Sequence, residues 1–110
     1  MPKLYQLTFY VPPTHLETVK DAIFNAGAGH YNGYDRCAWQ ALGRGQFRAL
    51  PGSEPYRGDI NRLECVEEVK VETLIEEHNV RKVLNAMLEA HPYEQPAYAV
   101  TCLLSIEDFH

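Results

Sequence analysis

Two short polar segments hold the residue types best suited to chemistry. The first contains His30, Asp35 and Cys37, and the second contains His91 and Glu94. Imidazole, thiolate and carboxylate groups are the ligands that proteins offer to zinc and copper. Each segment follows a predicted helix, and we expect both to leave the sheet at the same end. The sequence therefore predicts a candidate zinc or copper site, and its ligands would be His30, Cys37, His91 and Glu94.

Other interpretations of the same residues remain open. No compact ligand spacing such as C-x₂-C or H-E-x-x-H is present, so the fold alone would have to bring the ligands together. The same polar groups are also interpretable as structural hydrogen-bonding groups, which the lack of a ligand motif favours. Cys37 with a histidine base would be a nucleophile. No strand–nucleophile–helix turn accompanies Cys37, which begins a predicted strand, where buried cysteines are common.

A second candidate site is cationic. Arg44, Arg48 and Arg57 lie in a segment rich in glycine and proline, and together with Tyr93 they are candidates for binding an anionic ligand such as a phosphate. The glycines in this segment do not open a helix. The usual phosphate cradle at a helix N-terminus is therefore not predicted.

Pro92 and Pro96 stiffen the segment that carries His91 and Glu94. Each proline fixes its own φ and keeps the preceding residue out of the helical region. We expect the loop to display its polar side chains in one defined geometry.

Hydrophobic periodicity gives the elements that must position these residues. Apolar residues alternate along the predicted strands and recur every three to four residues along the predicted helices. Thr14 and Glu17 have the spacing of a capping box, and Gly27 is a typical helix-ending residue. The expected strands are residues 3–11, 37–43, 61–75 and 97–104, and the expected helices are residues 14–26 and 79–90.

This order of elements, βαββαβ, predicts an α+β fold, the ferredoxin-like sandwich. Right-handed crossovers place the first and third strands at the sheet centre and both helices on one face. Residues 44–59 form an extended excursion between the second and third strands. The other face of the sheet mixes polar, aliphatic and aromatic residues, as a subunit interface often does, so we expect a homo-oligomer.

Composition narrows the class of protein. The chain has 110 residues, the size of one domain, and we expect a single domain over residues 1–110 with no linker. Its net charge of −5 and its scattered basic residues argue against nucleic-acid binding. No signal peptide or membrane-length apolar run is visible. Three widely spaced cysteines do not make a disulfide framework, and we expect a cytoplasmic protein without a membrane partner.

Several segments together resemble one protein family. They are the first strand through Pro12, residues 26–30 with 33–37, Gly45 to Arg48 with Pro51 and Gly52, residues 55–58, residues 63–73, and residues 91–98. The combination resembles the inserted domain of bacterial Nif3-like (YqfO-type) proteins, which is itself similar to the trimeric PII and CutA folds. The resemblance covers nearly the whole chain.

The resemblance implies a PII/CutA-like trimer that works as a small non-enzymatic binding or regulatory module. Because PII-type proteins bind nucleotides near subunit clefts, it also keeps a small ligand or a metal at such clefts as an expectation. The two-metal site of full-length Nif3-like proteins lies in domains outside the resemblance, so hydrolase activity is not implied. The alternative is an accessory protein or stand-alone fragment related to Nif3-type metal-dependent hydrolases.

Overall fold

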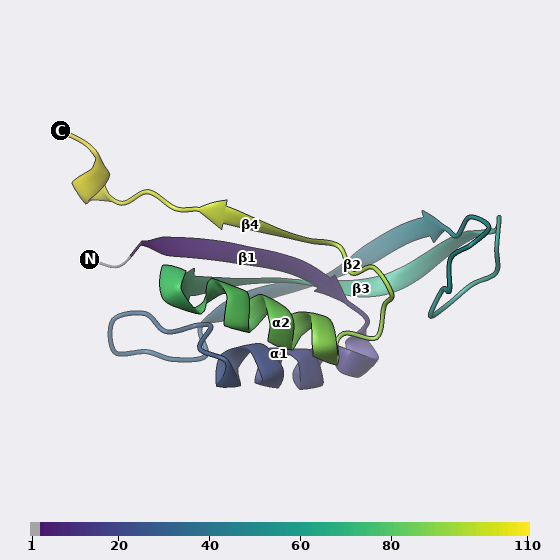
Figure 1. Cartoon of the computed structure of the whole chain (residues 1–110), viewed down its shortest axis with the longest axis horizontal. Helices are drawn as coiled ribbons and strands as arrows, with labels where there is room; N and C mark the ends of the chain where they lie inside the picture. Colours follow the sequence, from purple (N-terminus) through teal and green to yellow (C-terminus); the bar gives the residue numbers. More distant parts are fainter. Residues whose placement is uncertain (1–2) are drawn as a thin grey trace.

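The computed structural model describes residues 3–110 and shows a four-stranded antiparallel sheet with the strand order β2-β3-β1-β4. The strands and helices follow one another in the order βαββαβ, so the predicted fold class is confirmed (Figure 1). The central pair is the first and third strands, as the right-handed crossovers require. The elements are β1 Leu4–Val11, α1 Leu16–Asn25, β2 Ala38–Arg48, β3 Leu63–Glu76, α2 Val80–Ala90 and β4 Tyr98–Cys102.

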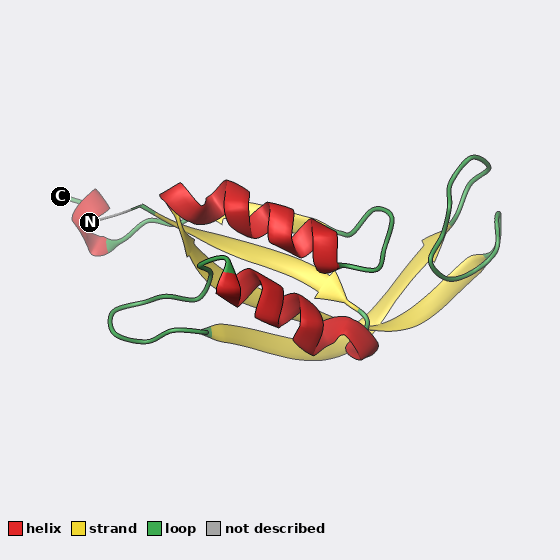
Figure 2. Cartoon of the chain, turned by 60° about the horizontal axis from the view of Figure 1, so that its bottom comes forward, coloured by secondary structure: helices red, strands yellow, loops and turns green. Residues whose placement is uncertain are grey.

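Both helices cover the same face of the sheet (Figure 2). Alternate residues of β1 point to this face, and Leu7, Phe9 and Val11 are fully buried there. The helices meet them with apolar residues at helical spacing, among them Ile23 of α1 and Met87 of α2. The core therefore lies in one layer between the helices and the sheet. In the described part of the chain, no helix lies over the opposite sheet face.

The start of α1 differs from the sequence prediction. A 3-10 helix, Pro13–His15, precedes α1, and His15 occupies the N-cap position without a side-chain cap. Thr14 therefore lies inside the short helix, where its Oγ1 contacts His15 Nδ1 at 2.9 Å. The predicted capping box of Thr14 and Glu17 is wrong, because the proline at the first turn starts the chain winding before Thr14 could cap it.

The strands β2 and β3 run well beyond the rest of the sheet. They pair continuously from Ala38↔Thr73 to Arg48↔Leu63, whereas β1 pairs with β3 only as far as Val69. The second strand is thus longer than the predicted residues 37–43, and much of the predicted excursion is a hairpin extension. We call residues 43–68, which comprise this extension and its connecting loop, the arm (Figure 1). With the arm included, the molecule measures 51 × 29 × 24 Å along its three principal axes.

Among residues 3–110, no helix has the length and apolar character needed to span a membrane.

Candidate functional site

The connection from α2 to β4 packs against the connecting loop of the arm. The backbone amide of Glu54 donates a hydrogen bond to Glu94 Oε1 at 3.2 Å. The rings of Tyr56 and Tyr93 lie 5.9 Å apart between centroids. We call this contact, between residues 53–57 and residues 91–94, the loop junction. The stiff loop predicted around Pro92 is therefore tied to the arm by a hydrogen bond and an aromatic contact.

His91 is the buried anchor of the loop junction. It follows the last residue of α2 and is only 6% exposed. Its Nε2 lies 2.6 Å from the carbonyl oxygen of Tyr10, and its Nδ1 lies 3.1 Å from the backbone nitrogen of Tyr93. Because a carbonyl only accepts and an amide only donates, the pair assigns the proton of a neutral imidazole to Nε2. Burial lowers the pKa of His91, which favours this neutral form.

Tyr93 lies between two other rings. Its centroid is 4.8 Å from that of His91 and 5.9 Å from that of Tyr56. Its hydroxyl is buried and has no hydrogen-bond partner among the described residues. Burial, together with the negative charge of Glu68, raises the pKa of Tyr93 to about 12. Tyr93 therefore remains a neutral phenol at neutral pH. Its ring packs against its neighbours, and its hydroxyl can still donate one hydrogen bond.

The four residues predicted to bind an anion are not all brought together in one chain. Arg57 is near enough to Tyr93 to act on its pKa. Glu68, which also acts on Tyr93, reaches across the position of Gly45 on the arm. Arg44 and Arg48 alternate with Gly45 along β2 and so belong to the opposite face of that strand. One chain thus offers two separate groups, Arg57 with Tyr93 and Arg44 with Arg48.

The connection from α1 to β2 carries the other candidate residues. A shallow hollow there is lined by the exposed His30 and Asp35 and by the half-buried Glu76. Cys37 is partly exposed, and its Sγ lies 3.8 Å from the carbonyl oxygen of Asp35. The backbone around it is fixed, because the Cys37 amide donates to the carbonyl of Gly29 at 3.0 Å.

The α1–β2 connection, which carries His30, and the α2–β4 connection, which carries His91, lie at opposite ends of the sheet (Figure 1). The expectation that both connections leave at the same end is wrong. Since β1 and β3 are antiparallel, the helices that follow them also run in opposite directions, and their connections emerge at opposite ends. The candidate ligands His30 and Cys37 are thus separated in one chain from His91 and Glu94. Among residues 3–110, no three His, Cys, Asp or Glu side chains form a group that could hold a metal ion.

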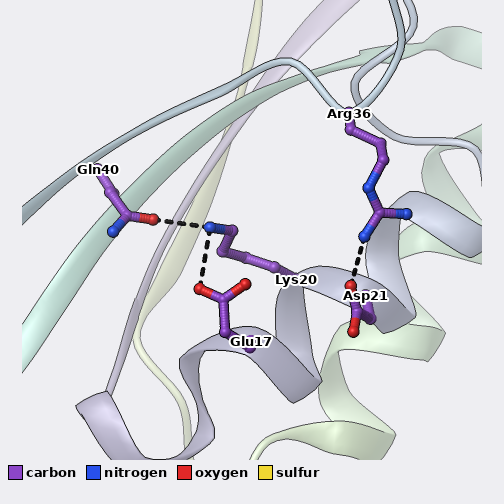
Figure 3. A network of polar contacts seen from close by, with 5 residues as sticks. All are labelled: Glu17, Lys20, Asp21, Arg36 and Gln40. Carbon is purple, nitrogen blue, oxygen red and sulfur yellow. Dashed lines mark hydrogen bonds and ion pairs between the residues drawn. The ribbon is translucent and has the colours of Figure 1, made fainter.

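Sequence reasoning missed a polar network that fixes the α1–β2 connection (Figure 3). Arg36 pairs with Asp21 of α1, and its guanidinium carbon lies 5.0 Å from the centroid of the Phe24 ring. Lys20 contacts Glu17 at 3.3 Å and Gln40 of β2 at 2.9 Å. These groups are mostly exposed, and exposed ion pairs contribute little stability. Their effect is to orient the connection against α1.

It also missed the partners in the loop junction. Glu54 and Tyr56 lie in a segment whose glycines and prolines hide any periodicity, and His15 belongs to the unexpected 3-10 helix. The ring of His15 lies 5.9 Å from that of Tyr56. No local pattern could pair these residues with a loop that follows α2, because the contact depends on how the arm bends back.

The sequence and the structure of this chain were both compared with those of known proteins. No family model matches the chain. The chain is 44% identical over 95 residues to a GTP cyclohydrolase 1 type 2 homolog of Halalkalibacterium halodurans, covering 86% of this chain and 26% of that protein. It is 42% identical over 97 residues to the Bacillus subtilis homolog, covering 88% of this chain and 26% of that protein. The chain thus spans about a quarter of the length of the curated relatives it matches.

Solved structures agree with these sequence matches. A Bacillus cereus protein related to NIF3 superposes with a TM-score of 0.80 at 40% identity, over 93% of this chain and 26% of that one. CutA from Synechococcus elongatus gives a TM-score of 0.68 at 13% identity, over 94% and 80% of the two chains. Bacillus subtilis GlnK gives 0.62 at 14% identity, over 92% and 84%. At such low identity, CutA and GlnK share the fold alone.

The sequence relatives and the NIF3-related structure each match this chain over about a quarter of their own length. The predicted resemblance is therefore confirmed: this chain is homologous to one domain of the NIF3-related GTP cyclohydrolase 1 type 2 homologs, and that domain has the CutA/PII-like fold.

Proposed function

We propose that the chain is a small, non-enzymatic binding or regulatory module that works as a trimer assembled through the open face of its sheet. The observation that carries this proposal is that face itself, which no helix within residues 3–110 covers. An antiparallel sheet can leave one face in water, but such a face is then usually polar. The face of this sheet is of mixed character.

The pairing register identifies the residues of the open face. Trp39 of β2 lies directly opposite Glu72 of β3, and Leu74 lies opposite Gln6 of β1. Trp39 is 57% exposed, and tryptophan is among the side chains that contribute most to interfaces. Polar neighbours such as Lys70 and Glu72, which form an ion pair at 3.4 Å, supply the wet part of such an interface. This mixture supports assembly of like subunits.

The arm supports a ligand site between subunits. It extends β2 and β3 past the core, with Arg44 and Arg48 exposed on one of its faces. Within one chain these arginines lie apart from Tyr93, so a site that uses both groups needs a second subunit. The GlnK structure of this fold is an ATP complex, which supports a small anionic ligand as the ligand class.

A metal is the second ligand class. The α1–β2 connection, which carries His30 and Cys37, lies at the opposite end of the sheet from the α2–β4 connection, which carries His91 and Glu94. A zinc or copper site that combines them therefore also requires two subunits. Some CutA proteins of the same fold are described as divalent cation tolerance proteins, which supports keeping this class in the proposal.

A second candidate function is that of an accessory protein or stand-alone fragment related to Nif3-type metal-dependent hydrolases. The 44% identity to a GTP cyclohydrolase 1 type 2 homolog favours it. Such an accessory would bind the remaining domains of a related protein, whereas the module we propose would bind its ligand as a homotrimer alone.

Calorimetric titration of the tag-free protein with ATP and, separately, with zinc tests the ligand part of the proposal. The double variant Arg44→Ala with Arg48→Ala should lose ATP binding, and the matched variant Arg81→Ala, on the exposed side of α2, should keep it. Absence of heat with ATP and with zinc at neutral pH, together with binding only to the other domains of a NIF3-related protein, would favour the second candidate.

A further inference from the structure

We propose that the hollow at the α1–β2 connection binds a guanidinium group, which an arginine side chain of a partner protein presents. Two tyrosines and two carboxylates line this hollow: Tyr31, Tyr34, Asp35 and Glu76. The tyrosine rings pack against the flat faces of the guanidinium, and the carboxylates accept its hydrogen bonds. The site belongs to one chain and lies at the other end of the sheet from the arm, so it is separate from the ligand site proposed between subunits.

A tight hairpin holds the two tyrosines side by side. Tyr31 and Tyr34 exchange two backbone hydrogen bonds of 2.9 Å and therefore form a directly opposed antiparallel pair. Asn32 and Gly33, which lie between them, have positive φ values of 44° and 87°, as a type I′ turn requires. Directly opposed residues send their side chains to the same face of a hairpin. The two rings are therefore neighbours, although they are 46% and 72% exposed.

The base of the hairpin is anchored to the sheet. The amide of Gly29 donates to the carbonyl of Leu74 in β3 at 2.7 Å, and the amide of Cys37 donates to the carbonyl of Gly29 at 3.0 Å. The first of these bonds brings the connection beside the end of β3, where Glu76 completes the hollow. A loop that is fixed before binding loses little conformational entropy when it binds.

The charges around the hollow favour a cation. Asp35 and Glu76 line it, whereas no Lys or Arg of the described residues does. Within residues 3–110, neither carboxylate forms an ion pair with a lysine or an arginine. The neighbouring Arg36 is already paired with Asp21 of α1. Because the face of a tyrosine ring also carries partial negative charge, all these groups attract a cation and repel a phosphate.

The spacing of these groups suits a large planar cation better than a metal ion. Within residues 3–110, no three His, Cys, Asp or Glu side chains form a group that could hold a metal, so His30, Asp35 and Glu76 of one chain do not converge on a single point. A guanidinium spreads five N–H donors around a plane and bonds carboxylates along its edge while an aromatic ring packs on its face. Separate carboxylates beside two aromatic rings match this shape.

The openness of the hollow indicates that the guanidinium belongs to a larger partner. The hollow has a volume of about 490 Å³ but is shallow. A site for a small molecule encloses most of its ligand, whereas this one leaves one side of its occupant open. An arginine on a peptide gains further contacts outside the hollow, and the net charge of −5 on the chain attracts a basic partner.

Chemical-shift titration of the tag-free, ¹⁵N-labelled wild-type protein at low salt tests the site. The probe is a short peptide with two arginines, and its control is the same peptide with citrulline, which has nearly the shape of arginine without the charge. We expect the arginine peptide to shift the amides of residues 30–35 and of Glu76, and the citrulline peptide to shift none of them. Free arginine amide should shift the same amides but bind roughly tenfold more weakly, because it makes fewer contacts.

Variants assign the binding to the lining residues. Asp35→Asn with Glu76→Gln should raise the dissociation constant of the arginine peptide roughly tenfold, because two charge-assisted hydrogen bonds are weakened. The matched control is Glu67→Gln with Glu89→Gln, which removes two exposed charges elsewhere and should change it less than about twofold. Tyr34→Leu should raise the dissociation constant about threefold through the loss of a cation–π contact. Tyr98→Leu on β4, which is 44% exposed, should not.

Four outcomes would overturn the proposal. They are an arginine peptide that shifts no amide of residues 30–35, a citrulline peptide that binds equally well, a free arginine amide that binds as tightly as the peptide, and a double carboxylate variant that binds like the wild type. The first three comparisons use only the wild-type protein, so they remain decisive if a variant does not fold.

Discussion

The backbone amide of Glu54 donates a hydrogen bond of 3.2 Å to the carboxylate of Glu94, although 40 positions separate the two residues in the chain. This bond joins the connecting loop of the arm to the loop that follows α2. The aromatic contact between Tyr56 and Tyr93 lies beside it. The arm is therefore braced by the α2–β4 connection in addition to the pairing of its own two strands.

Replacing Glu94 with alanine should weaken this brace. The Glu54 amide is exposed and can turn to water, so we expect a loss of about 0.5–1 kcal/mol in the free energy of unfolding. Urea denaturation measures it. Gln95→Ala is the matched control, since Gln95 is also exposed and takes no part in the Glu54–Glu94 hydrogen bond. Equal stability of both variants would show that the hydrogen bond does not hold the arm.

The free energy of unfolding should depend on pH through His91. Because the folded state lowers the pKa of His91, the unfolded chain binds more protons below about pH 6.5. Stability should therefore fall as the pH drops below 6.5, by at most about 1.4 kcal/mol per pH unit for this one group. Urea denaturation at several pH values measures the slope, and His91→Gln should reduce it. If the free energy of unfolding of His91→Gln changes with pH as steeply as that of the wild type, other titratable groups cause the pH dependence.

Gly29 and Gly33 offer a matched pair for the backbone of the α1–β2 connection. Both have positive φ, +83° and +87°, but a Cβ on Gly29 would lie 2.8 Å from the backbone nitrogen of Cys37, whereas a Cβ on Gly33 would meet nothing within 4 Å. Gly33→Ala should cost about 1 kcal/mol for its conformation alone. Gly29→Ala should cost about 2 kcal/mol or more, because the Cys37 backbone must also move. Thermal unfolding of the two variants checks this order, and equal melting temperatures would contradict it.

The fold was predictable because its elements obey local rules. Alternation in β1 and the apolar spacing of both helices follow directly from burial on one face, and the crossover rule then fixes the strand order. The start of α1 was not predicted correctly, since a capping box and a proline-initiated turn compete over the same residues and the turn wins. The length of β2 was underestimated because its glycines at 43 and 45 mask a strand that cross-strand pairing sustains.

The candidate site was predictable only in part. The sequence identified His91 and Glu94 as fixed polar groups, and the structure shows what they bind, Tyr10 and Glu54 respectively. Those partners depend on the bend of the arm, which no local pattern encodes. The pairing of His30 with His91 failed for a topological reason, because antiparallel strands send their helices in opposite directions.

Trp39 provides the most direct variant for the proposed interface. Trp39→Glu should place a charge on the open face and dissociate the trimer, while changing the stability of the subunit by less than about 0.5 kcal/mol because the side chain is exposed. Leu88→Glu, on α2, is the control that should leave assembly intact. Val66 would be a poorer choice, since it is only 9% exposed within one chain and a charge there would disturb the arm. If the Trp39→Glu protein still has the mass of a trimer in solution, the open face is not part of the interface.

The mass of the wild-type protein in solution tests the central claim most directly. Sedimentation equilibrium of the tag-free chain at micromolar concentration should give three times the 12.6 kDa of one chain. A single species of 12.6 kDa under these conditions would contradict assembly through the open sheet face and, with it, a ligand site built between subunits.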